Sequence, residues 1–199
     1  MERQTLQAEV REQRGKGPAR QLRMQGRIPG ILYGPGLDPM ALSVTPKHLV
    51  RVLSTPWGRN VLVEVAAGDK KELCMVRELQ AHPVTGFPLH VDFYRVDLER
   101  PVRVTVPFAT RGRAIGVQKG GKLKKVYREV PVVAVPERIP SVIEVDVSAL
   151  DQGQTLTVGE LPLPEGVSVA LKPDRTVVVI EGERKKRGEE ETEDAAKAG

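Results

Sequence analysis

Hydrophobic and polar residues alternate over most of the first half of the chain, and this pattern predicts half-buried β-strands. In residues 4–10, Leu6, Ala8 and Val10 fall on the same side of the predicted strand. Further strands are predicted over residues 28–33, 40–44, 60–65 and 72–79 and at the end of residues 82–94. A Gly-Asp turn at residues 68–69 separates two of these strands, so they are predicted to form a hairpin.

One helix is predicted among these strands. Thr45 and Pro46 are typical of a helix start, and the helix is predicted to continue to Leu53. Leu49, Val50 and Leu53 have the spacing of a helix.

The second half of the chain reads almost entirely as short strands and turns. Candidate strands cover residues 101–110, 122–127, 128–135, 142–147, 167–171 and 176–181. With no good helix among them, a β-sandwich or partly open barrel is predicted. The stretch 96–100 is expected to join two domains, residues 1–95 and 96–182, and the charged segment 183–199 is expected to be disordered.

Residues 11–27 are strongly basic and contain the single acid Glu12. The six basic residues of this region are Arg11, Arg14, Lys16, Arg20, Arg23 and Arg27. Exposed backbone N–H groups at a helix start, with cations beside them, suit the oxygens of a phosphate. A solvated helix face is the alternative interpretation.

A short helix is predicted over residues 19–25 of this region, because Pro18 suits a first helical turn and Gly26 a C-terminal cap. At about 100° per residue, Arg20, Arg23 and a continuing Arg27 share one face of this helix. The apolar residues of the helix, Ala19 and Leu22, are expected to point toward a core.

Charge is unevenly distributed along the 199 residues, whose net charge is only +5. Residues 111–128 contain no acid and seven basic residues: Arg111, Arg113, Lys119, Lys122, Lys124, Lys125 and Arg128. The end of the chain is acidic at residues 189–194. Two basic regions and an acidic end favour a polyanionic partner. The sequence of residues 111–128 is equally compatible with a phosphate-binding loop and with a mobile, solvated loop.

The sequence contains little that would support a catalytic site or a metal site. The single cysteine, Cys74, lies in an alternating strand, where cysteine is usually a small apolar filler, and it excludes an internal disulfide. The histidines, His48, His82 and His90, have no metal-binding spacing, and no phosphate-binding nucleotide loop is present. No catalytic residue, metal or cofactor is therefore expected.

The chain has no apolar signal region or membrane-spanning run, so a soluble, cytoplasmic protein is expected.

The strand that ends residues 82–94 has two contrasting faces. One carries Leu89, Val91 and Phe93, and the other carries His90, Asp92 and Tyr94. The second face is expected to present hydrogen-bonding groups and an aromatic ring on an exposed sheet surface. A cross-strand hydrogen bond or ordinary polar surface would explain it equally well.

Several separated motifs resemble one known family. Residues 15–23 (GKGPARQLR) and 26–34 (GRIPGILYG) closely resemble the start of bacterial large-subunit ribosomal protein twenty-five. Residues 89–93 (LHVDF) match the family's second signature in order and spacing. Residues 126–129 and 139–150 resemble the C-terminal β domain of the two-domain form, called CTC or general stress protein.

This resemblance implies a non-catalytic protein that binds 5S ribosomal RNA near its internal loop E. It also implies a fold that is mainly β, with an α+β N-terminal domain built as a small β-barrel with short helices, followed by an all-β, sandwich-like domain. The positions that match the family's RNA-contacting residues are Arg11, Lys16, Arg20, Arg23, Tyr33, Gln80, His90 and Asp92. Ala19 stands where the family often has serine and Ala81 where it often has a basic residue, so one contact is missing at each.

The leading hypothesis is therefore a structural constituent of the large ribosomal subunit, monomeric off the ribosome. Its C-terminal domain would contact neighbouring ribosomal proteins or 23S rRNA. The alternative is a stress-response protein that meets the ribosome transiently and holds a protein partner with its C-terminal domain. A third, enzymatic hypothesis rests only on Cys74 and the histidines.

Overall fold

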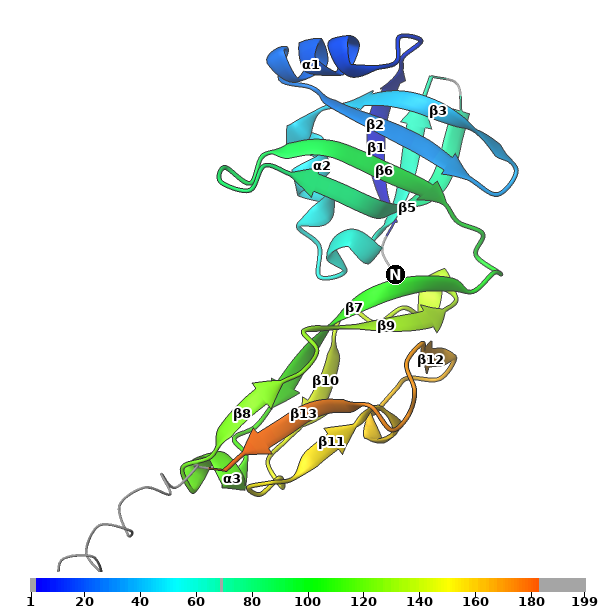
Figure 1. Cartoon of the computed structure of the whole chain (residues 1–199). Coiled ribbons are helices and arrows are strands. Elements are labelled where there is room, and N and C mark those ends of the chain that lie inside the picture. The colour runs from blue at the N-terminus through cyan, green and yellow to red at the C-terminus, as the bar shows by residue number, and fades with distance from the viewer. Residues whose placement is uncertain (1–2, 69, 183–199) are drawn as a thin grey trace, which may run out of the picture. The chain divides into compact units, whose positions relative to one another are not determined.

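The computed structural model describes residues 3–68 and 70–182. Their fold is mainly β, as predicted (Figure 1). The chain divides into two compact units, of which the first comprises residues up to 107 together with 129–143 and 163–170. The second comprises residues 108–128, 144–162 and those from 171 onward. The domain boundary between residues 95 and 96 stays a prediction, and the segment 183–199 lies outside the described residues.

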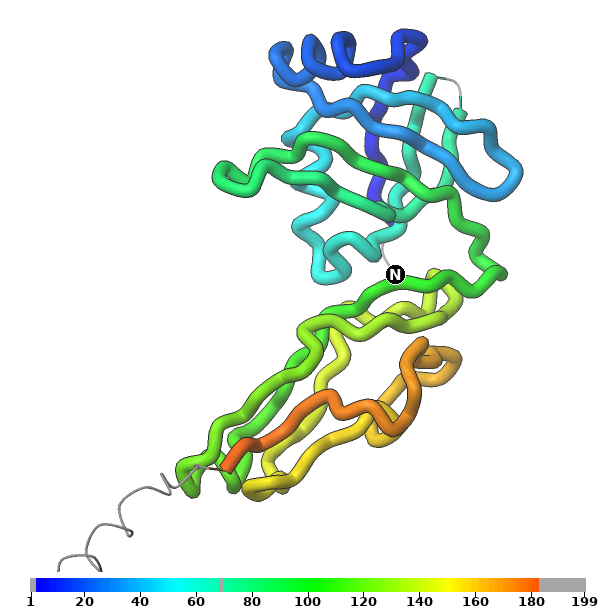
Figure 2. Tube along the Cα trace, viewed as in Figure 1, coloured from blue at the N-terminus to red at the C-terminus, as the bar shows by residue number. Residues whose placement is uncertain are grey.

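Six strands of the first unit form a closed barrel (Figure 1). They are β1 (Arg3–Val10), β2 (Ile28–Gly34), β3 (Leu37–Val44), β4 (Leu62–Ala67), β5 (Lys70–Ala81) and β6 (Pro88–Arg95). Around the barrel their order is β1-β3-β2-β6-β5-β4. The pairs β1–β4 and β2–β6 are parallel and the other neighbours are antiparallel, including the predicted β4–β5 hairpin. The turn between β5 and β6 extends beyond the barrel wall (Figure 2).

The barrel is filled by the side chains that alternate inward along its strands. Leu6, Leu32, Val63 and Phe93 are fully buried in one continuous core. Val10 shares the inward side of β1 in the sequence pattern, but its side chain is 53% exposed, so the prediction of a buried position was wrong at the end of this strand.

Helix α2 (Pro46–Leu53) begins at the predicted proline and packs one face onto the barrel core. Its fully buried residues are Leu49 and Val52, whereas Val50 is 50% exposed. The face of α2 that packs on the barrel is therefore centred on Leu49 and Val52. A single 3₁₀ turn, η1 (Gly58–Asn60), leads from α2 toward β4.

Helix α1 (Lys16–Met24) begins three residues before the predicted start, within the glycine turn. None of its residues is fully buried, so the expectation that Ala19 and Leu22 point into a core is met only by partial burial. Arg27 lies beyond the helix end, which corrects the prediction that it continues the face of Arg20 and Arg23.

Strands dominate the rest of the chain, as predicted. One sheet has the order β10-β7-β9-β12 and a second has the order β11-β13-β8. Their bounds are β7 (Val102–Arg111), β8 (Lys122–Lys125), β9 (Glu129–Ala134), β10 (Ile143–Asp146), β11 (Thr155–Thr157), β12 (Val167–Val169) and β13 (Thr176–Glu181). Two 3₁₀ turns, η2 (Pro136–Arg138) and η3 (Val158–Glu160), connect them.

Two elements of the second unit were not predicted: strand β11 and the one-turn helix α3 (Ile115–Gln118). Because α3 and β8 both lie within residues 111–128, this region is not the loop that the sequence analysis considered. In the described part of the chain, no helix is long and apolar enough to cross a membrane.

Candidate nucleic-acid interface

Three adjacent strands of the barrel bring the predicted sheet residues onto one outward surface. Strand β6 lies between β2 and β5, and Tyr33 of β2 pairs in register with Tyr94 of β6. Gln80 of β5 pairs in register with His90 of β6. Because Val91 and Phe93 point into the core, the alternate residues of β6 point outward. We call the surface formed by Tyr33, Gln80, His90, Asp92 and Tyr94 the strand face.

His90 and Asp92 form a close pair within β6. His90 Nδ1 lies 2.7 Å from Asp92 Oδ1, and the two side chains are 26% and 23% exposed. His90 Nε2 and Asp92 Oδ2 are left for a ligand. The contact brings the two side chains together on the outward side of β6.

Tyr33 lies at the other end of the strand face. Its ring meets that of Tyr94 edge-on, with centroids 5.7 Å apart and an interplanar angle of 73°. Burial, and next the negative charge of Asp92, raise the pKa of the Tyr33 hydroxyl. The hydroxyl therefore stays protonated at neutral pH and can donate a hydrogen bond.

A second carboxylate, Glu78, lies on this surface and was missed by the sequence analysis. Gln80 Nε2 donates a 3.0 Å hydrogen bond to Glu78 Oε1, and Glu78 pairs in register with Asp92. A bulge between Val76 and Glu78 shifts the register and brings the two acids opposite each other. No sequence pattern marks such a bulge. These two acids offer a polyanion no charge attraction, and as carboxylates they can only accept hydrogen bonds.

Arg23 connects helix α1 to the strand face. Its Nε donates a 2.9 Å hydrogen bond to the carbonyl oxygen of Leu89, the residue before His90. One of its five N–H groups is therefore used within the fold, and the others can reach a phosphate. This contact places the helix beside His90 and Asp92.

Two other cations of α1 are fully available. Lys16 and Arg20 are exposed, and neither has a side-chain partner among the residues that the structure describes. At helical spacing they lie on the same side of α1 as Arg23. Gly15, at the N-terminal end of the helix, has a φ of 104° and supplies no side-chain cap, so the first backbone N–H groups also stay open. We call the surface of Lys16, Arg20 and Arg23 the cationic helix face.

Arg11 takes a different position from the other predicted cations. Its Nε donates to the carbonyl of Leu42 and its Nη1 to that of Gln13, both at 3.0 Å. Burial, and then the charges of Arg14 and Arg23, lower the pKa of its guanidinium. Arg11 therefore stabilises the chain between β1 and α1, with only part of its guanidinium left for a ligand.

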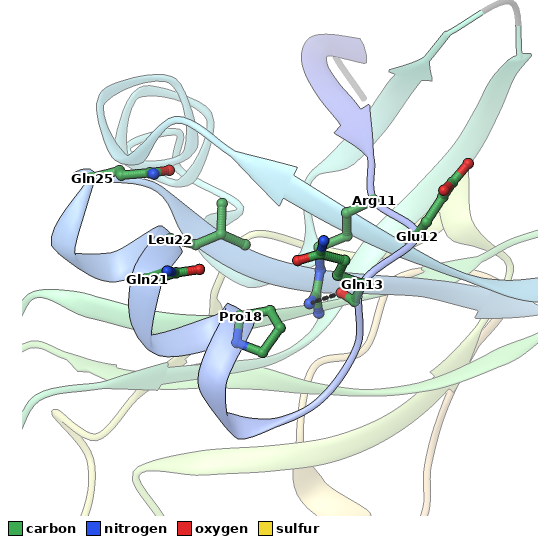
Figure 3. Close-up of a pocket in the computed structure, with 7 residues that line it drawn as sticks. All are labelled: Arg11, Glu12, Gln13, Pro18, Gln21, Leu22 and Gln25. Atoms are coloured by element: carbon green, nitrogen blue, oxygen red, sulfur yellow. Dashed lines mark hydrogen bonds between the residues drawn. The ribbon is translucent and has the colours of Figure 1, made fainter.

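Arg11 also lines a hollow of about 400 Å³ beside α1 (Figure 3). The hollow is lined by Arg11, Glu12, Gln13, Pro18, Gln21, Leu22 and Gln25. It carries one positive and one negative charge, so it has no net attraction for phosphate. The structure thus brings together Tyr33, Gln80, His90 and Asp92, and Arg23 joins α1 to their strand. The Arg11 guanidinium is instead engaged by two carbonyl oxygens.

Arg27 is engaged within the barrel and adds nothing to the cationic helix face. Its Nη1 pairs with Glu9 Oε2 on β1. Its Nε is buried without a partner in the described part of the fold. The helix ends at Met24, so the backbone beyond it carries Arg27 toward β1.

Cys74 belongs to the barrel core and is fully buried. Burial, and next the charge of Glu72, raise the pKa of its thiol to about 12. A nucleophilic cysteine needs a thiolate near neutral pH. Within residues 3–68 and 70–182, no group of three or more His, Cys, Asp or Glu residues could hold a metal ion.

We expect Cys74 to react with a thiol reagent at pH 8 only when the barrel opens. The folded thiol is protonated at this pH and closed to solvent, whereas the unfolded chain exposes a thiol with an ordinary pKa near 8.5. The reaction rate with and without denaturant measures this difference. A Cys74→Ser variant gives the background, and equally fast labelling in both conditions would contradict the burial.

Two family models match the sequence of this chain. Residues 6–93 match the ribosomal L25p family, and residues 101–184 match the C-terminal domain of ribosomal protein TL5. The large ribosomal subunit protein bL25 of Sorangium cellulosum is 41% identical over 194 residues, which cover 97% of this chain and 85% of that protein. The chain belongs to the bL25 family of ribosomal proteins, in its two-domain CTC form.

Other bL25 proteins support the same assignment along the full chain. That of Moorella thermoacetica is 39% identical over 183 residues, covering 90% of this chain and 88% of the relative. That of Pelobacter propionicus is 38% identical over 200 residues, covering 100% and 98%. Membership in a family of ribosomal proteins confirms the prediction that the chain is not an enzyme.

Proposed function

We propose that this protein is a structural component of the large ribosomal subunit and binds 5S rRNA in the region of loop E. Within this proposal the protein acts in the cytoplasm and is monomeric off the ribosome. The observation that supports it best is the contact from Arg23 to Leu89, which joins the cationic helix face to the strand face. A surface with cations on one side and oriented hydrogen-bonding groups on the other suits RNA.

The two faces would contribute differently. Lys16, Arg20 and Arg23 would contact phosphates, which position the protein without reading sequence. Duplex RNA presents 2′-hydroxyls and base edges in a wide, shallow minor groove. His90 and Asp92 protrude from a rigid strand and can reach such groups. Asp92 would accept a hydrogen bond from a 2′-hydroxyl or a base amino group, and the irregular shape of loop E would supply the distinctive geometry.

Binding of the intact protein to a 5S RNA fragment containing loop E, compared with transfer RNA across a salt series, tests the proposal. Binding that depends on loop E and survives about 0.2 M salt would support a specific site, since purely ionic binding weakens steeply with salt. Equal affinities that fall together with salt would reject it. That outcome would favour the alternative of a transient, stress-related ribosome partner.

Arg20→Ala is expected to weaken binding to both RNAs. It should also reduce the magnitude of the negative slope of log K against log salt by about 0.7–0.9, the value for one phosphate contact. Arg20 has no partner among the described residues, so the variant should keep its stability. Arg23→Ala should weaken binding by a second route, because it also removes the bond to Leu89.

The matched control is Arg51→Ala. Arg51 is an exposed arginine on α2, and its side chain has no partner in the described fold. Its loss should change neither affinity nor slope. Equal effects of Arg20→Ala and Arg51→Ala would mean that α1 contributes only net charge.

A further inference from the structure

A groove of about 940 Å³ lies within the first unit, and every residue that lines it belongs to that unit. Its walls come from β7, from the segment around η1 and from residues of β2, β5 and β6. The groove shares Tyr33 and Tyr94 with the strand face, so the two surfaces are continuous. Its volume is within the range of about 300–1,000 Å³ that is usual for ligand sites. We call it the β7 groove.

Two hydrogen bonds hold β7 in place along this groove. Asn60 Nδ2 donates to the carbonyl oxygen of Thr105 at 2.9 Å, and Asn60 itself is buried. Arg77 Nη1 donates to the carbonyl oxygen of Arg103 at 3.0 Å. Because both bonds use backbone carbonyls of β7, they fix the strand as a wall and leave the side chain of Arg103 free.

The β7 groove is cationic. Three arginines line it, Arg59, Arg77 and Arg103, against the single acid Glu129, which gives a formal charge of +2. Arg59 and Arg103 are exposed, and their side chains have no partner among the residues that the structure describes. These two guanidinium groups are therefore available to an anionic ligand.

Aromatic rings line the same groove. The chain has seven Phe, Trp and Tyr residues, and three of them gather here: Tyr33, Trp57 and Tyr94. Trp57 is half-buried, because part of its ring packs against the barrel core while the residue also lines the groove. Aromatic rings beside free arginines suit unstacked bases and the phosphates that link them. The bases of a duplex are already stacked on one another and offer no free face to such rings.

We propose that the β7 groove binds unpaired nucleotides of RNA. Trp57 stacks on a base, and Arg59 and Arg103 contact phosphates. The inference goes beyond the proposed 5S site, because these three residues lie outside both the strand face and the cationic helix face. The aromatic rings favour RNA over an acidic protein segment, which would use the arginines alone.

The fluorescence of Trp57 tests the stacking directly, because Trp57 is the single tryptophan of the chain and lines the groove. The full chain is titrated with an oligouridylate of about ten nucleotides, a length typical of single-strand sites. A fully paired RNA duplex with the same number of phosphates is titrated separately. Oligouridylate should quench the fluorescence to a saturating level, since a stacked base contacts the indole ring. The duplex should quench it much less.

The double variant Arg59→Gln, Arg103→Gln tests the phosphate contacts across a salt series. The magnitude of the negative slope of log K against log salt for oligouridylate should fall by about 1.4, at about 0.7 for each contact on a single strand. The variant should keep its urea midpoint, because neither side chain has a partner in the described fold. The matched control is Arg51→Gln, Arg175→Gln, which removes two exposed arginines that lie outside the groove and have no side-chain partner among the described residues. The control should leave the slope nearly unchanged.

The test also separates this inference from the proposed 5S site. Both double variants should keep the preference for the loop E fragment over transfer RNA, because neither changes the strand face or the cationic helix face. Absence of that preference in the wild-type protein would reject the 5S proposal and leave the quenching by oligouridylate to decide this one.

Four outcomes would overturn the inference. Fluorescence that oligouridylate leaves unchanged would show that no base reaches Trp57. Equal quenching by the duplex would show that the groove does not select unpaired nucleotides. Equal slope changes in the two double variants would show an effect of net charge alone. Quenching by polyglutamate but not by oligouridylate would identify an acidic protein segment as the occupant.

Discussion

Asp92→Ala is expected to reduce the preference of this protein for the loop E fragment over transfer RNA by about 10- to 100-fold. The carboxylate contacts His90 Nδ1 through Oδ1 and keeps Oδ2 for the RNA, so its removal would abolish a directed contact to the RNA and the contact with the imidazole. Specific hydrogen-bond contacts to bases contribute about 1–3 kcal/mol to discrimination, and 1.4 kcal/mol is tenfold. Affinity for transfer RNA should change little, because the variant removes no cation.

Two variants make this result interpretable. Arg20→Ala should weaken binding to both RNAs together, since it removes a phosphate contact. Asp92→Asn keeps an acceptor oxygen and removes the negative charge, so it should retain more discrimination than Asp92→Ala. If Asp92→Ala weakened binding to both RNAs equally, the strand face would not be a specificity element.

Phe93→Ala is expected to destabilise the barrel by about 3–5 kcal/mol. Phe93 is one of the largest fully buried side chains of the described fold and lies on the same strand as His90 and Asp92. Truncation would leave a cavity beneath the strand face, so RNA binding should fall with stability. Trp57 is the only tryptophan of the chain and packs against the barrel core, so its fluorescence reports the barrel's unfolding in urea.

Phe87→Ala is the matched control for this measurement. Phe87 lies in the turn between β5 and β6 and is 40% exposed. The same truncation should lower the free energy of unfolding by about 1 kcal/mol or less, because part of the ring already contacts water. Similar losses for Phe87 and Phe93 would contradict the described core.

The alternation of hydrophobic residues located the barrel strands well. Leu6 and Ala8 on β1, and Val91 and Phe93 on β6, point inward as the pattern predicts. Alternation could not show how the strands close. The parallel pairing of β1 with β4, in which Leu6 lies opposite Val65, joins segments far apart in the sequence and carries no local signal.

Helix faces were predicted less accurately than strand faces. The apolar spacing of α2 is compatible with several faces, and contact with the barrel selects Leu49 and Val52 over Val50. α1 has no fully buried residue, so its position depends on specific contacts such as that of Arg23 with Leu89.

The chemical character of the candidate site is present in the sequence itself. The basic region around Arg20 and the polar face of His90 and Asp92 follow from residue type and strand periodicity alone. The tertiary structure decided which of these groups are available. It uses Arg11 to hold the Leu42 and Gln13 carbonyls, and it places Glu78 opposite Asp92 through a bulge. In the second unit it neutralises Lys119 and Lys124 and leaves Lys122 and Lys125 exposed. Charge and periodicity are local properties of a sequence, whereas the pairing of a side chain depends on residues that only folding brings near it.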